Sequence, residues 1–99
     1  MSSNEHPLVI KYKNFSPISK NLAAKAREVF PGGDTRASAH YSPYPLSISK
    51  ASGCVLTDVD GNQILDFMNN FTSLIHGHAH PQVVDSVQNQ VSLGSAYAA

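Results

Sequence analysis

A tight-turn signal between two apolar runs constrains this chain more than any other feature. Asp60-Gly61-Asn62 separates the runs Cys54–Val59 and Gln63–Phe67. Asp-Gly supplies the positive φ angles that a tight hairpin turn requires, so the two runs are predicted to pair as antiparallel strands. The segment Leu46–Ser49 alternates as a third short strand would. The sequence therefore predicts a small three-stranded antiparallel sheet.

The aspartates around this turn also suggest a calcium loop. An EF-hand loop has glycine at its sixth position and glutamate at its twelfth. Counted from Asp58, glycine is the fourth residue and Asn69 the twelfth. Turn chemistry explains the run completely, so we favour the hairpin over a calcium site.

Two helices are predicted, one on each side of the sheet. Ser16-Pro17 has the pattern of an N-cap followed by proline at the first helical position. The apolar residues that follow recur at helical spacing, and Pro31-Gly32-Gly33 ends the helix. Pro81 opens the second helix, whose valines form one apolar stripe and whose end Gly94 caps.

Two segments show neither a helical nor a strand period. Residues 1–15 mix polar residues with one short apolar run and are predicted to form a flexible N-terminal arm. Residues 34–45 are polar, aromatic and proline-bearing, which predicts a long irregular connection of the kind that usually has a function. Arg36 lies in this connection. Taken by itself it fits an exposed loop arginine, although a guanidinium can also grip a carboxylate or phosphate with two parallel hydrogen bonds.

Three alternating histidines suggest a metal site. On an extended segment His76, His78 and His80 would project to one face, and imidazole is a good ligand for zinc, copper or nickel. Three ligands from so short a segment are sterically awkward, and no carboxylate or cysteine lies nearby in sequence to complete the shell. We therefore favour the simpler interpretation, in which His80-Pro81 is the entrance to the second helix.

Composition excludes several classes of partner. Seven basic and seven acidic side chains cancel, without a basic run, so no nucleic-acid partner is indicated. No apolar stretch approaches the ~20 residues needed to span a bilayer, so no membrane role is expected. The single cysteine, Cys54, cannot form an internal disulfide, and the first residues lack a signal-peptide pattern. A cytoplasmic protein is expected.

Four short blocks along the chain carry a family resemblance. They are Phe30–Arg36, Tyr44–Leu46, Gly53–Asn62 with Asp66-Phe67, and His76–Pro81. Taken in this order, the blocks resemble class III pyridoxal-phosphate-dependent aminotransferases. The Pro-Gly-Gly-Asp-Thr-Arg opening is similar to the branch that contains glutamate-1-semialdehyde aminomutases and β-amino-acid aminotransferases. The resemblance extends from about Phe15 to Ala99.

The resemblance implies a fold-type I enzyme that works as a homodimer and holds pyridoxal phosphate in a large α/β domain. This chain matches only the amino-terminal portion of such an enzyme. The expected fold class is α+β: a helix, a small three-stranded antiparallel sheet and a helix, with the large cofactor domain absent. Residues 16–99 are accordingly expected to be a partial N-terminal segment.

Two substrate-binding residues are implied by the resemblance. Arg36 matches the arginine that clamps the substrate carboxylate in the β-amino-acid branch. Phe71 matches an aromatic position that lines the substrate pocket, with packing in the sheet core as its alternative role. Asp60 and Gly61 carry over only as turn residues, and the three histidines only as structural residues.

No catalytic, cofactor-binding or metal-binding residue is expected in this chain. In the family, the loop that binds the cofactor phosphate, the aspartate facing the pyridine nitrogen and the Schiff-base lysine all lie beyond the position of Ala99. The lysines present here do not correspond to that site: they are Lys11, Lys13, Lys20, Lys25 and Lys50. The chain alone is therefore expected to be inactive, as a fragment of an enzyme that transfers an amino group between an amino acid and a keto acid.

Two alternatives stay open. The full-length form could be an aminomutase of the glutamate-1-semialdehyde type. The chain could also have a non-catalytic role as a remnant that binds a full-length aminotransferase subunit.

Overall fold

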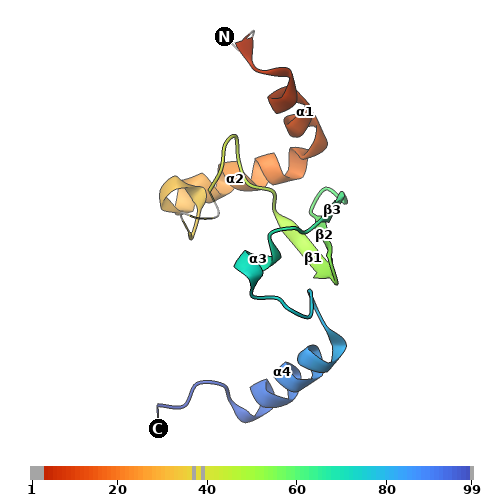
Figure 1. The fold of residues 1–99 in the computed structure, drawn as a ribbon. Coiled ribbons are helices and arrows are strands. Elements are labelled where there is room, and N and C mark those ends of the chain that lie inside the picture. The colour runs from red at the N-terminus through yellow and green to blue at the C-terminus, as the bar shows by residue number, and fades with distance from the viewer. Residues whose placement is uncertain (1–3, 37, 39, 99) are drawn as a thin grey trace.

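The computed structural model describes residues 4–36, 38 and 40–98. Its elements follow one another along an elongated molecule, with the described ends of the chain far apart (Figure 1). In chain order they are α1 (Pro7–Phe15), α2 (Pro17–Val29), a 3₁₀ turn (Pro31–Gly33), β1 (Ile48–Ser52), β2 (Val55–Asp58), β3 (Gln63–Leu65), α3 (Asn69–Thr72) and α4 (Pro81–Leu93). The predicted α+β arrangement of helix, antiparallel sheet and helix is confirmed.

The sheet has the order β1-β2-β3, and both pairs of strands are antiparallel. Leu56 in the central strand lies opposite Ala51 of β1 and Ile64 of β3. The first strand begins at Ile48, two residues later than the sequence predicts. The reason is that the N–H groups of Leu46 and Ser47 donate to side-chain hydroxyls outside the sheet.

Helix α1 occupies part of the segment that was predicted to be a flexible arm. Pro7 stands at its first position, and the His6 imidazole accepts a hydrogen bond from the Leu8 N–H at 3.2 Å. None of its residues is buried, so no stripe of apolar side chains is needed to face a core. That is why the sequence showed no helical period there.

Helix α2 begins at Pro17 as predicted, but Ser16 does not cap it with its side chain. The two oxygens of the Asp60 carboxylate, in the hairpin turn, accept hydrogen bonds from the N–H groups of Ile18 (2.7 Å) and Ser19 (3.1 Å). A carboxylate at this end of a helix satisfies otherwise unpaired N–H groups and matches the helix dipole. Asp60 is thus more than a turn residue, because it joins the sheet to α2.

The hairpin turn is itself held by a buried carboxylate. Asp58 is 1% exposed and accepts hydrogen bonds from the N–H groups of Asp60 and Asn62 and from the Asn62 side chain. The Asn62 side chain also donates to the carbonyl of Phe15, at the end of α1. The turn therefore contacts both N-terminal helices through polar bonds.

A second set of polar contacts fixes the irregular connection against the helices. Tyr44 is 3% exposed, and its hydroxyl is 3.0 Å from the buried Ser16 hydroxyl. Its carbonyl accepts a hydrogen bond of 2.8 Å from the Tyr12 hydroxyl. Burial and a hydrogen bond to Tyr41 raise the pKa of Tyr12, which keeps that donor protonated. Polar groups thus make up most of the fully buried positions in this segment.

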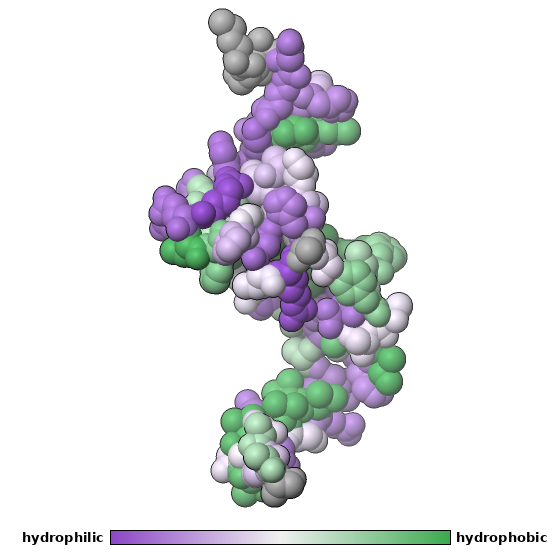
Figure 2. Space-filling view, turned by 90° about the vertical axis from the view of Figure 1, so that its left-hand side faces the viewer, coloured by the Kyte–Doolittle hydropathy of each residue, from purple (hydrophilic) through white to green (hydrophobic). Residues whose placement is uncertain are grey.

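Large hydrophobic side chains lie mostly on the surface. Tyr44 is the only buried hydrophobic residue among those described, and many leucine, isoleucine, valine and phenylalanine side chains are exposed. Figure 2 shows such side chains gathered over the lower end of the molecule, where α4 lies. No helix in the described part of the chain is both long and apolar enough to cross a membrane.

Candidate functional site

Arg36 lies in the irregular connection, three residues after the end of the 3₁₀ turn Pro31–Gly33. It is exposed and lines a cavity of about 370 Å³. The cavity wall also includes Asp34, Thr35 and His40. Such a cavity is large enough to admit part of a small ligand, and the Arg36 side chain forms part of its wall.

The charges at this cavity leave the guanidinium of Arg36 available. The Asp34 carboxylate, two residues away, is hydrogen-bonded to Nδ1 of His40. Among the residues that the structure describes, no carboxylate lies within salt-bridge distance of Arg36. A guanidinium without an internal partner can receive the carboxylate of a ligand.

Phe71 lies in α3, a single turn that follows the sheet. It lies outside the strands and is 61% exposed, so the described residues do not bury it against the sheet. All four residues of α3 have positive φ angles: 52° at Asn69, 46° at Asn70, 56° at Phe71 and 70° at Thr72. A run of left-handed residues without glycine stores strain, which is typical of functional sites.

The Asp66 carboxylate holds the start of this left-handed turn. Its Oδ1 accepts hydrogen bonds from the N–H groups of Met68 and Asn69, each at 2.9 Å. Its Oδ2 lies 2.5 Å from Nε2 of His78. The Asn69 N–H and the His78 imidazole lower the pKa of Asp66, so the carboxylate is charged at neutral pH. The sequence did not indicate this bond, because nothing in its local pattern relates residues 12 positions apart.

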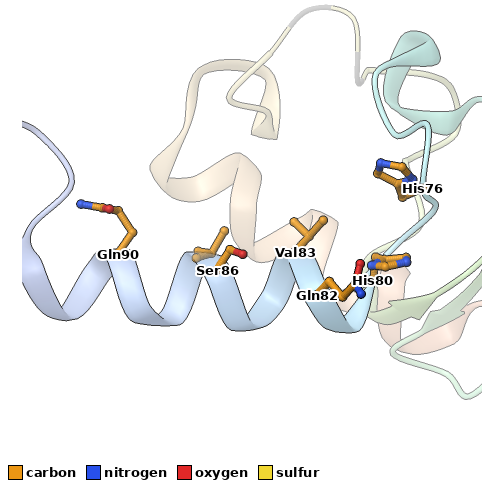
Figure 3. Close-up of a pocket in the computed structure, with 7 residues that line it drawn as sticks. His76, His80, Gln82, Val83, Ser86 and Gln90 are labelled. Carbon is orange, nitrogen blue, oxygen red and sulfur yellow. The ribbon is translucent and has the colours of Figure 1, made fainter.

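The three alternating histidines do not converge. His78 bonds to Asp66, whereas the rings of His76 and His80 have centroids 5.3 Å apart at the entrance to α4. These two rings line a cavity of about 540 Å³ whose other polar walls are side chains of α4 (Figure 3). No group of three possible metal ligands occurs among residues 4–36, 38 and 40–98.

An apolar groove runs beside the same helix. It has a volume of about 390 Å³ and is formed by residues of the loop before α4 and by one face of the helix. The apolar wall residues are Leu74, Ile75, Val83, Val84 and Val87. Exposed valines at this spacing are typical of a helix that packs against a further element.

The lysines do not form a site that fits pyridoxal phosphate. A Schiff-base lysine is held in a site that tunes its pKa. Lys11, Lys20, Lys25 and Lys50 are exposed, and Lys13 is paired with Glu5. The described lysines therefore offer no residue set that fits a Schiff base with the cofactor.

The structure does not place the two predicted substrate-binding residues in one cavity. Phe71 is not among the residues that line the cavity at Arg36. In the view of Figure 1 the irregular connection and α3 are both drawn to the left of the strands.

Comparison with known proteins identifies the group to which these features correspond. Residues 36–98 match the family described as aminotransferase class III. A glutamate-1-semialdehyde 2,1-aminomutase from Methanobrevibacter smithii is 43% identical over 80 residues, which cover 81% of this chain and 19% of that protein.

Solved structures give the same correspondence. An ω-transaminase from Sphaerobacter thermophilus matches with 44% identity and a TM-score of 0.76, over 81% of this chain and 18% of that one. A β-phenylalanine aminotransferase from Variovorax paradoxus matches with 28% identity and a TM-score of 0.81, over 87% and 20%. Another matched transaminase structure has pyridoxal phosphate bound. The chain thus spans about a fifth of the length of these relatives.

Proposed function

Because this chain belongs to the class III aminotransferase family, we propose that it forms the amino-terminal, substrate-facing part of a pyridoxal-phosphate-dependent aminotransferase. In such an enzyme the cofactor, when bound elsewhere in the protein, carries the amino group between an amino acid and a keto acid. The observation that carries the proposal is Arg36, an exposed cation at a cavity with no carboxylate partner among the described residues.

Arg36 binds the substrate carboxylate in this proposal, and Phe71 provides an aromatic wall of the substrate pocket. A planar guanidinium matches a carboxylate with two parallel hydrogen bonds, which orients the substrate as well as holding it. The strained turn at Phe71 is consistent with a residue whose position matters for function. The apolar groove beside α4 packs against the rest of the enzyme, which works as a cytoplasmic homodimer.

The aminomutase activity is the second candidate, and it is favoured by the aminomutase of M. smithii at 43% identity. Two chimeras separate the two candidates. In the first, this chain replaces the matching first part of the S. thermophilus ω-transaminase, and in the second it replaces that of the M. smithii aminomutase; both products are loaded with pyridoxal phosphate. Amino transfer from β-phenylalanine to 2-oxoglutarate by the first, with no activity of the second, supports the aminotransferase, and isomerisation of glutamate 1-semialdehyde by the second, with no activity of the first, supports the aminomutase. Folded, loaded chimeras that do neither would contradict the proposed function.

The alternative role, in which this chain binds an aminotransferase subunit without catalysis, predicts a different result. In that case the separate chain would co-purify with a full-length aminotransferase subunit after co-expression. Its absence from the purified enzyme would remove this alternative.

The isolated chain is expected not to form a specific cofactor adduct. Incubation with pyridoxal phosphate, reduction with borohydride and mass mapping should yield weak labelling spread over several lysines, since four of the five are exposed and none lies in a pocket that matches the cofactor. Bovine serum albumin at equal lysine concentration sets the background. Stoichiometric labelling of one lysine would show that the chain has a cofactor site of its own.

Removal of the Asp60 carboxylate is expected to loosen α2 from the sheet. In the transaminase chimera, Asp60→Ala leaves the N–H groups of Ile18 and Ser19 without acceptors, which should lower the free energy of unfolding by about 0.5–2 kcal/mol. Asp60→Asn keeps one acceptor oxygen and should lose less. Urea unfolding measures both, and Glu28→Ala on the exposed part of α2 is the control. Equal stability of Asp60→Ala and Glu28→Ala would contradict the cap.

A further inference from the structure

We propose that His78 is a positioning residue for Phe71, which it controls through the Asp66 carboxylate. The proposal rests on the proposed function, because that function gives Phe71 a place beside the substrate. Neither His78 nor Asp66 touches the substrate in this scheme. Their role is to hold the left-handed turn α3 in the conformation that presents Phe71.

His78 is fixed to the sheet through its backbone. Its N–H donates to the Gly53 carbonyl and its carbonyl accepts from the Gly53 N–H, both at 2.9 Å. Gly53 lies between β1 and β2. The neighbouring Gly77 permits this close approach, because a Cβ there would lie 2.9 Å from the Gly53 carbonyl oxygen. The backbone that carries the imidazole is therefore hydrogen-bonded on both sides to Gly53.

The imidazole of His78 orients the Asp66 carboxylate. Nε2 and Oδ2 are 2.5 Å apart, and the two side chains are 21% and 9% exposed. Because the carboxylate is charged, Nε2 carries the hydrogen in this bond. The backbone of Asp66 is fixed as well, since its N–H donates to the Cys54 carbonyl at 2.8 Å. With Oδ2 held by His78, Oδ1 faces the first N–H groups of the turn.

The turn needs such support because its backbone is strained. Residues in sparsely populated backbone regions are strained and persist only when their surroundings fix them. Here Phe71 and the β-branched Thr72 both have positive φ angles, 56° and 70°. The bonds from the N–H groups of Met68 and Asn69 to Asp66 link this turn to the residue that follows β3. Without an oriented carboxylate, the turn should relax and Phe71 should move.

The kinetic test uses the loaded transaminase chimera and a pair of substrates, β-phenylalanine and 3-aminobutyrate. His78→Ala should raise KM for the aromatic substrate about tenfold, with little change for the aliphatic one, because only the aromatic ring needs Phe71. His78→Gln retains an N–H donor near the Asp66 oxygen and should recover most of the loss. Equal losses for both substrates would overturn the proposal, since that is the effect of general unfolding.

A double-mutant cycle tests whether His78 acts through Phe71. Phe71→Ala alone should produce the same selective loss, and His78→Ala added to Phe71→Ala should have little further effect. Full additivity of the two losses would mean that the residues act independently and would overturn the proposal. Absence of a selective loss in Phe71→Ala would overturn it as well.

A structural readout keeps this test separate from the proposed function. Crystal structures of the chimera with and without His78→Ala should show that residues 69–72 return to negative φ angles only in the variant. If the chimera is inactive yet this change occurs, the proposed function fails and the positioning role stands. An unchanged turn in His78→Ala would overturn the positioning role whatever the activity.

Discussion

The 99-residue chain alone is expected to lose its circular-dichroism signal gradually on heating, without a cooperative transition. Its radius of gyration is 17.1 Å, whereas a compact domain of about 100 residues has about 13 Å. Tyr44 is the only hydrophobic residue buried among those described. Cooperative unfolding requires a shared apolar core, which these residues do not build between themselves.

Calorimetry gives the sharpest measurement of this expectation. The chain alone should show no heat-absorption peak, while the transaminase chimera should show one, because the rest of the enzyme is expected to cover the apolar faces of α2 and α4. Matched concentrations and buffer make the comparison direct. A single peak with an unfolding enthalpy near the roughly 60–80 kcal/mol of a 100-residue domain would show that the chain folds independently.

Local signals in the sequence were enough for the sheet and for two of the helices. The Asp60-Gly61 turn, the Ser16-Pro17 start of α2 and the Pro81 and Gly94 bounds of α4 all lie where the sequence predicts them. Each depends on backbone restrictions of single residues, which act whatever the rest of the chain does.

The features that the sequence did not predict depend on long-range contacts or on strain. Helix α1 buries no residue and so lacks an apolar period. The left-handed turn at Phe71 contradicts the propensities of its residues, and only Asn69 and Asn70 tolerate positive φ readily. The Asp66–His78 bond depends on the loop before α4, which returns to the sheet. There His78 pairs with Gly53 in an isolated bridge outside the named strands.

The sequence predicted the two candidate site residues, Arg36 and Phe71, to different degrees. The family resemblance selected Arg36, and the structure adds an exposed position at a cavity wall and an Asp34 carboxylate engaged by His40. For Phe71 the sequence left two roles open, and the structure adds that the residue is exposed in the turn after the sheet. Substrate binding by either residue stays a prediction.

Removal of the Arg36 guanidinium is expected to have the largest effect on activity. In the loaded transaminase chimera, Arg36→Ala should lower kcat/KM for β-phenylalanine by about 100-fold or more, because a hydrogen bond to a charged group contributes about 1.5–3 kcal/mol and the guanidinium can make two. Arg36→Lys keeps the charge but loses the paired geometry, so its loss should be intermediate.

A substrate without a carboxylate shows whether the loss arises from carboxylate binding. With 1-phenylethylamine as amino donor, Arg36→Ala should have nearly the activity of the unmodified chimera, because no carboxylate is left for the guanidinium to bind. Lys20→Ala removes an exposed cation of α2 and controls for net charge. If both donors lost activity equally, Arg36 would serve the fold of the irregular connection. A loss confined to β-phenylalanine would place the substrate carboxylate at the cavity beside the Asp34–His40 pair, on the loop where the sequence first suggested a function.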